Sequence, residues 1–229
     1  MPIETILARR LGDRFHDVRA QMPRHQTLQF GSLNPANLIG IAAHHTAASR
    51  EQTALQVAEF HITKPDPFAG IGYHFLVRLG HVYYVGDVNT QRAHVAGRND
   101  VLLGACMTGD YAQIAPHSAD ALALKEVVLG IDEWLGRKLP VNGHNEWSLE
   151  GHGTKCPGAF QPVAQNIRTD SAPAQPPPAQ PPSTQPKWGT LVWYAEEIQR
   201  AYEAVGEPAR SKNVGDNVTR DLISRRDRR

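Results

Sequence analysis

The stretch VNGHNEWSLEGHGTKCPG, residues 141–158, places two histidines and a cysteine within eighteen residues. These three side chains are His144, His152 and Cys156. Much earlier in the chain, the pair His44-His45 follows a short apolar run. Catalytic zinc sites take three protein ligands of these types and keep a fourth coordination position open for water. We therefore predict that the fold brings the two segments together around one zinc ion.

The composition predicts one folded domain with an appendage. The chain has 229 residues, of which 41% are hydrophobic, and this is enough for one sizeable core. Its net charge is +1, from 24 basic and 23 acidic residues, so we expect no nucleic-acid partner. The two cysteines, Cys106 and Cys156, make no disulfide framework, and the histidines near Cys156 favour metal binding.

The N-terminal segment lacks the apolar core of a signal peptide. Charged side chains interrupt the apolar positions of MPIETILARRLGDRF, residues 1–15, every few residues. No stretch of the sequence is apolar for long enough to cross a bilayer. We therefore expect synthesis in the cytoplasm, no transmembrane segment, and export by another protein if the chain acts outside the cell.

Apolar spacing predicts the first two elements. Residues 3–22 carry apolar side chains at intervals of three and four, which is typical of an amphipathic helix that Pro23 ends. Residues 37–48 form a short apolar run that turns abruptly polar. This pattern predicts a buried strand that delivers His44 at its end.

Three further helices are predicted from the same periodicity. Residues 49–62 predict a helix with Ser49 as its N-cap and Gln52 at the capping-box position. Residues 119–135 predict a second long amphipathic helix. A short helix is expected over residues 162–168, because proline is favourable in the first helical turn.

Two β segments complete the main domain. Residues 72–87 predict a hairpin that turns at Leu79-Gly80. Alternation places three of its side chains on one face: Tyr73, Phe75 and Val77. Residues 101–107 predict a central strand that buries Cys106.

The sequence changes character after residue 170. The segment SAPAQPPPAQPPSTQP has almost nothing to bury and predicts a polyproline II linker. We thus predict a main domain over residues 1–170, a Pro-rich linker over 171–187, and one amphipathic helix with a basic tail over 188–229. A single helix cannot build its own core. We expect it to self-associate, to dock on the main domain or to meet another surface.

Four motifs resemble the zinc N-acetylmuramoyl-L-alanine amidases, which are related to peptidoglycan recognition proteins and the T7-type phage lysozyme. They occur in the order IAAHHTA, GYHFLV, HVAGRNDVLLGACMTGDY and GHNEW…TKCPG, and the resemblance covers roughly residues 37–168. It implies an α/β fold with a central mixed sheet flanked by helices, and one catalytic zinc ion in a surface cleft. It also implies that the partner is peptidoglycan, cleaved at the amide that joins muramic acid to the L-alanine of the stem peptide.

The resemblance assigns the metal ligands residue by residue. The first histidine of HHTA, the histidine of GHNEW and the cysteine of TKCPG are the family's ligands, and here they are His44, His144 and Cys156. Neighbouring strand residues point to opposite faces, so only one of His44 and His45 faces the metal. We place His45 among the substrate-binding residues. His152 competes with His144, but two flanking glycines hold its backbone poorly, which favours His144.

The same comparison suggests the remaining site residues. Tyr73 in GYHFLV and Thr154, two residues before the cysteine, match catalytic positions that position water or stabilise an oxyanion. Lys155 lies one residue out of that register and is the alternative to Thr154. His94 and Asn99 match positions that line the substrate groove, with plain structural roles as the alternative. Glu146 is either the proton donor to the leaving amine or a residue that orients His144.

The predicted function is that of a peptidoglycan amidase, most simply a phage or prophage endolysin released to the wall by a holin-type export. One alternative is a non-catalytic peptidoglycan receptor on the same fold, which the loss of a zinc ligand would favour. Another is a cytoplasmic amidase that recycles wall fragments. Such enzymes usually carry aspartate where Cys156 stands, and they need no Pro-rich spacer.

Overall fold

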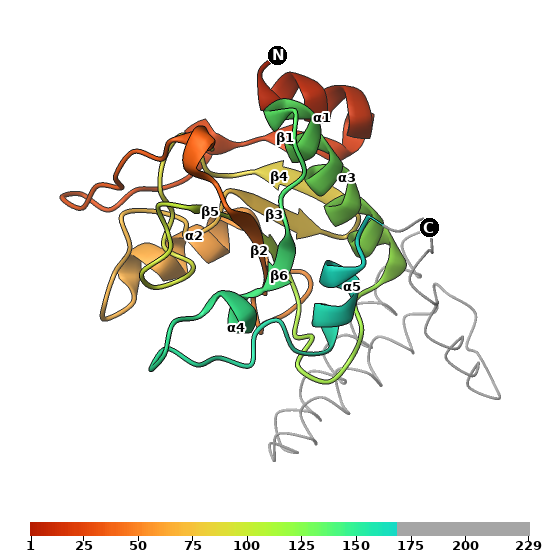
Figure 1. Cartoon of the computed structure of the whole chain (residues 1–229). Coiled ribbons are helices and arrows are strands. Elements are labelled where there is room, and N and C mark those ends of the chain that lie inside the picture. Colours follow the sequence, from red (N-terminus) through yellow and green to blue (C-terminus); the bar gives the residue numbers. More distant parts are fainter. Residues whose placement is uncertain (169–229) are drawn as a thin grey trace, which may run out of the picture. The chain divides into compact units, whose positions relative to one another are not determined.

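A computed structural model of the chain describes residues 1–168, so the predicted linker, C-terminal helix and basic tail lie outside the described residues. Within residues 1–168, a six-stranded sheet has the order β1-β4-β3-β5-β2-β6 (Figure 1). The strands are β1 (Phe15–Asp17), β2 (Gly40–His45), β3 (Phe75–Arg78), β4 (His81–Tyr84), β5 (Leu102–Met107) and β6 (Val141–Gly143). All neighbours pair in parallel except β3 and β4, so the sheet is mixed, as predicted.

Helices cover both faces of the sheet (Figure 1). The helices α1 (Ile3–Leu11) and α3 (Ser118–Leu135) bury their apolar sides in one large cluster with Phe75, Leu103 and Met107. The helix α2 (Ala54–Thr63) packs in a smaller cluster with Cys106. All six residues of β5 are buried, which confirms the predicted central strand and the buried position of Cys106.

The prediction of one helix over residues 3–22 is wrong beyond Leu11. Gly12 ends α1 with a φ of +59°, a backbone conformation that glycine adopts without a Cβ penalty. The chain then forms β1, which adds an edge strand parallel to β4. Val18 and Met22 pack against the opposite cluster from α1. The regular apolar spacing therefore runs from α1 and β1, which face the large cluster, into the segment after β1, which faces the smaller one.

The helix predicted over residues 49–62 begins later than expected. Its N-cap is Thr53, whose Oγ1 accepts a hydrogen bond from the backbone N–H of Gln56 at 3.3 Å. The Gln56 side chain accepts in return from the backbone N–H of Thr53 at 2.8 Å, which completes a capping box. Ser49 instead accepts from the backbone N–H of Glu51 within the preceding loop.

The hairpin turns at Leu79-Gly80 as predicted, and both residues have positive φ values of 52° and 79°. Phe75 and Val77 share the large cluster, whereas Tyr73 packs on the other side with the smaller one. The prediction of a common face fails at Tyr73, because it precedes β3 and the strand alternation does not extend to it.

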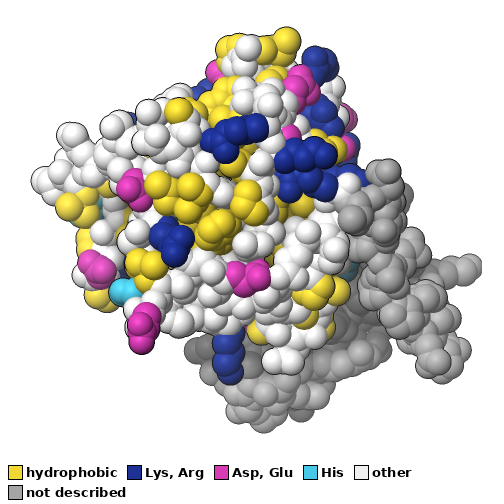
Figure 2. All heavy atoms as spheres, viewed as in Figure 1, with side chains coloured by type: hydrophobic (Ala, Val, Ile, Leu, Met, Phe, Trp, Pro, Cys, Tyr) yellow, Lys and Arg dark blue, Asp and Glu magenta, His cyan; other side chains and the backbone are white. Residues whose placement is uncertain are grey.

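Short helices follow the last strand. The helix α4 (His144–Trp147) begins directly after β6, and α5 (Gln161–Gln165) replaces the helix predicted over residues 162–168. The predicted helix over 119–135 is confirmed by α3. Within residues 1–168, none of the helices is both long and apolar enough to cross a membrane. On the face seen in Figure 2, basic side chains are interspersed with acidic and apolar ones.

Candidate active site

The parallel pairing of β2 and β6 brings the two candidate histidine ligands to one edge of the sheet. Ala43 lies beside Gly143 in the register, so the next residues, His44 and His144, leave the same end of neighbouring strands. Cys156 follows on the loop after α4. Its carbonyl oxygen accepts from the backbone N–H of Asn145 at 2.8 Å, which ties that loop to the start of α4.

The candidate ligand atoms of His44, His144 and Cys156 all lie within 4.8 Å of one another. Nδ1 of His44 is 3.9 Å from Sγ of Cys156, and the rings of His44 and His144 are 4.6 Å apart between centroids. A tetrahedral zinc ion holds nitrogen ligands at about 2.0–2.1 Å and sulfur at about 2.3 Å, so such spacings suit this ion. The structure leaves His152 exposed and outside the cluster.

The protonation states of these groups fit a metal site. Burial lowers the pKa of His44 well below its ordinary value, and it also lowers the pKa of His144. Both imidazoles are therefore neutral near pH 7, which is the form that binds metals. Burial raises the pKa of the Cys156 thiol to about 11, opposed by a hydrogen bond from the His45 backbone. A bound cation would favour the thiolate, so the donor set fits a divalent metal such as zinc.

His94 is a buried neighbour of His44. Its Nδ1 is 3.2 Å from Nε2 of His44, the two rings meet edge to face, and the side chain is buried. Its ring lies over Gly104 of β5, where an added Cβ would come within 2.8 Å of it. The buried ring of His94 thus contacts a candidate ligand, and its predicted role in lining the substrate groove stays a prediction.

Asn99 holds the backbone of the loop that carries His94. Its Oδ1 accepts hydrogen bonds from the backbone N–H groups of His94 and Val95, both at 2.9 Å. These two hydrogen bonds give Asn99 a structural role, and its predicted position in the groove wall stays a prediction. Sequence reasoning did not detect this arrangement.

Tyr73 lies beside the candidate metal ligands. Its ring centroid is 5.2 Å from that of His44, and its hydroxyl is within hydrogen-bonding range of the Cys106 thiol. Burial raises the pKa of Tyr73 well above its ordinary value, with the Cys106 and Cys156 thiols acting in the same direction. The hydroxyl therefore stays protonated near pH 7 and can act as a hydrogen-bond donor.

His61 is a neighbour of this site that no sequence motif indicated. Its Nδ1 accepts from the backbone N–H of Gly72 at 3.0 Å, and its ring centroid is 5.4 Å from that of Tyr73. Burial, with Lys64 adding to it, lowers the pKa of His61 to about 4. A neutral His61 therefore holds the backbone just before Tyr73.

The loop before Cys156 is organised by Thr154. Its Oγ1 accepts from the backbone N–H of Cys156 at 3.2 Å, and its hydroxyl hydrogen stays available for a second partner. Lys155 is exposed. Thr154 therefore lies next to a candidate ligand, as predicted, and it also shapes the loop.

Two predicted residues have other partners. His45 points to the opposite face of β2 from His44, where its Nδ1 accepts from the backbone N–H of Tyr111 at 2.8 Å. The structure therefore does not bring its side chain to the ligand cluster, and its predicted role in substrate binding stays a prediction. The two carboxylate oxygens of Glu146 accept from Gly143 N–H at 2.8 Å and from Gln165 at 2.7 Å. These bonds favour the orienting role for Glu146, at the start of α4.

This fold is that of the peptidoglycan recognition proteins and of phage endolysins. Drosophila peptidoglycan recognition protein SD shares 22% identity over 69% of this chain and 97% of its own, with a TM-score of 0.58. The Ph2119 endolysin from a Thermus scotoductus bacteriophage shares 23% identity over 67% and 98%, with a TM-score of 0.52. Human PGRP-IBETAC, solved with a glycosamyl muramyl pentapeptide, shares 19% over 70% and 98%, with a TM-score of 0.55. These identities show a common fold.

The family follows from the sequence profile. The profile of the N-acetylmuramoyl-L-alanine amidase family matches residues 34–159, which is more than half of the chain, and the chain belongs to this family. No curated protein sequence matches this chain. The matched residues include all three candidate ligands and Tyr73.

Proposed function

We propose that this chain is a zinc-dependent amidase that hydrolyses the bond between N-acetylmuramic acid and the L-alanine of the peptidoglycan stem peptide. The single observation that supports this proposal best is the cluster of His44, His144 and Cys156, whose ligand atoms lie within 4.8 Å of one another. Family membership and the fold of the relatives support peptidoglycan as the substrate.

The ligand set suits hydrolysis. Zinc bound by two neutral imidazoles and one thiolate would polarise a carbonyl and lower the pKa of water. His94 fixes the orientation of the His44 ring through their 3.2 Å contact. Asn99 fixes the backbone of His94, and His94 in turn contacts the ring of His44. One candidate ligand is therefore oriented before a metal ion binds.

Tyr73 and Thr154 supply hydrogen-bond donors next to this cluster. The Tyr73 hydroxyl is protonated near pH 7, so it would donate to the oxyanion that develops on the scissile carbonyl. The Thr154 hydroxyl accepts from Cys156 N–H and would donate its own hydrogen to the same oxyanion or to the attacking water. Both carboxylate oxygens of Glu146 already accept hydrogen bonds, so we assign Glu146 no proton transfer.

The biological role we propose is that of an endolysin, which acts on the cell wall after release from the cytoplasm. The Ph2119 endolysin has the same fold and is covered almost completely by this chain. A non-catalytic receptor remains the second candidate, because peptidoglycan recognition proteins share the fold. The complete His, His, Cys set favours the enzyme over the receptor.

Digestion of purified sacculi tests the proposal. The full chain with zinc should release stem peptides that begin at L-alanine, detectable by mass spectrometry. Chelation should abolish the release, and added Zn²⁺ should restore it. A receptor would bind sacculi and release nothing, whereas a recycling amidase would cleave soluble muropeptides and leave intact sacculi unchanged. Release that survives exhaustive chelation would contradict the zinc mechanism.

A further inference from the structure

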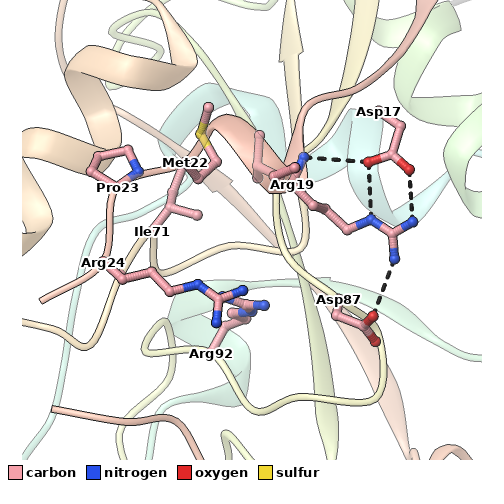
Figure 3. Close-up of a pocket in the computed structure, with 11 residues that line it drawn as sticks. Asp17, Arg19, Met22, Pro23, Arg24, Ile71, Asp87 and Arg92 are labelled. Atoms are coloured by element: carbon pink, nitrogen blue, oxygen red, sulfur yellow. Dashed lines mark hydrogen bonds and ion pairs between the residues drawn. The ribbon is translucent and has the colours of Figure 1, made fainter.

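A cavity lies away from the candidate metal ligands. It has a volume of about 410 Å³ and is lined by residues from the segment that follows β1 and from the chain on both sides of the β3–β4 hairpin (Figure 3). None of the three candidate metal ligands lines it. The cavity is large enough for a small-molecule group or the end of a short chain.

Arg92 lines this cavity and is 92% buried, since only 8% of its surface is exposed. Its Nε is buried without a hydrogen-bond partner, and within residues 1–168 its guanidinium makes no ion pair. Its guanidinium carbon lies over the face of the Phe30 ring, 4.8 Å from the ring centroid, in a cation–π contact. Gly86 makes room for it, because a Cβ there would lie 2.6 Å from the Arg92 Nε. Buried charged groups normally have hydrogen-bond partners. The buried Nε of Arg92 has none, so a bound anion would supply the missing acceptor.

A second guanidinium lies at the same cavity. Arg24 lines the cavity together with Arg92, their head groups overlap in the view of Figure 3, and the charge of Arg24 acts on Arg92. In the described part of the chain, no hydrogen bond or ion pair of Arg24 is found. Burial, and after it the charge of Arg24, lowers the pKa of Arg92 to about 10. Arg92 therefore stays cationic near pH 7, and an anion bound between the two guanidinium groups would offset their repulsion.

The carboxylates of the cavity wall are already used by Arg19. Its Nη2 is 2.6 Å from Oδ2 of Asp17, and its Nη1 is 3.1 Å from Oδ2 of Asp87 (Figure 3). These ion pairs engage both acidic side chains with Arg19, and the charge of Asp87 also acts on Arg92. The rest of the wall is largely apolar and includes Met22, Pro23, Ile71 and Val85. The cavity thus presents the guanidinium groups of Arg24 and Arg92 beside an apolar wall.

We propose that this cavity is a binding site for an oxyanion, a carboxylate or a phosphate, carried on a short aliphatic stem. A guanidinium presents parallel N–H donors that match the paired oxygens of either group. Arg92 and Arg24 would hold the oxyanion, and the apolar wall would contact the stem. The site goes beyond the proposed amidase function, because it needs neither zinc nor a muramyl group.

A titration of the ¹⁵N-labelled full chain followed by NMR tests this site. The probes are glutarate, which carries carboxylates on an aliphatic stem, inorganic phosphate, and glutaramide as the uncharged match of glutarate. Glutarate or phosphate should shift the Nε–Hε signal of Arg92, assigned by its absence in Arg92→Met, and glutaramide should not. The two anion arms distinguish a carboxylate ligand from a phosphate ligand.

Arg24→Met and Arg92→Met should each weaken anion binding by about 10-fold or more, the loss typical of a charged hydrogen-bond partner. Arg14→Met is the matched control, because Arg14 lies outside the cavity and makes no ion pair within residues 1–168. Arg24 is exposed, so its replacement tests the site even if Arg92→Met unfolds. If neither anion binds, or if Arg24→Met binds as tightly as the unchanged chain, the proposed site is wrong.

Discussion

Nε2 of His44 lies 3.2 Å from Nδ1 of His94, while Nδ1 of His44 lies 3.9 Å from Sγ of Cys156. The two ring nitrogens of His44 therefore face different partners. One is occupied by a buried histidine, and the other points to a candidate ligand. This arrangement leaves Nδ1 as the nitrogen for a metal and makes His94 the residue that orients the ring.

His94→Phe should weaken zinc binding by about 10- to 100-fold, the usual loss when the residue that orients a metal ligand is removed. Phenylalanine keeps a ring over Gly104 and cannot make the hydrogen bond to His44. Competition with a chelator of known affinity measures the effect. His117→Asn is the control, because His117 is exposed and lies at the N-cap of α3. Unchanged zinc affinity in His94→Phe would show that the His44 ring is fixed by other contacts.

His144→Ala should abolish stoichiometric zinc binding, and His152→Ala should keep it. The reason is geometric, since His144 is in the ligand cluster and His152 is exposed outside it. Zinc content of both purified variants, measured side by side, checks this assignment. The opposite pattern would mean that the loop rearranges and that His152 is the ligand.

Tyr73→Phe should keep zinc and lower kcat by about 10²-fold or more, as expected on removal of one oxyanion donor. Zinc stoichiometry and sacculus digestion are measured together on the same preparation. The Tyr73 hydroxyl also approaches Cys106, so Cys106→Ala is a useful companion variant. If Tyr73→Phe loses zinc together with activity, the tyrosine supports the structure of the site rather than the chemistry.

Acid should destabilise the metal-free protein through its buried histidines. Burial lowers the pKa of His61 to about 4 and that of His94 to about 3, below the 6.5 of an exposed histidine. The unfolded chain therefore binds these protons first as the pH falls. The free energy of unfolding should be constant above about pH 6.5 and should fall below it, by at most about 1.4 kcal/mol per pH unit for each histidine.

Urea unfolding at pH 7, 6 and 5 measures this slope. His61→Asn should make it shallower, because asparagine does not titrate while its Oδ1 can still accept from Gly72 N–H. An unchanged slope in His61→Asn would show that His61 is not the buried neutral group that the structure indicates.

A protein ending at Asp170 should fold and cleave soluble muropeptides as fast as the full chain. Residues 1–168 contain the whole described sheet, its clusters on both faces and every candidate ligand. On intact walls the shortened protein should be slower if the remaining residues raise the local concentration at the surface. Thermal unfolding and both activity assays check this, and a shortened protein that fails to fold would show that the later residues complete the core.

The sequence by itself identified the fold family and the cluster of candidate metal ligands, because both depend on short motifs. The motifs around His44, His144 and Cys156 named the three side chains that the structure brings within 4.8 Å. The apolar runs of β5 and α3 were also readable, since each buries its pattern against a continuous core. Such local patterns can be recognised in the sequence without knowing which distant residues they contact.

Only the tertiary structure decided what surrounds that centre. Apolar spacing could not separate α1 from the segment that carries Val18 and Met22, because periodicity does not reveal whether successive residues face one core or two. The positions of His94, His61 and Tyr73 depend on contacts with β5, Gly72 and His44, which lie far away in sequence or outside regular strands. A hydrogen bond between distant side chains leaves no periodic trace in the chain, so its partners become known only when the strands are placed side by side.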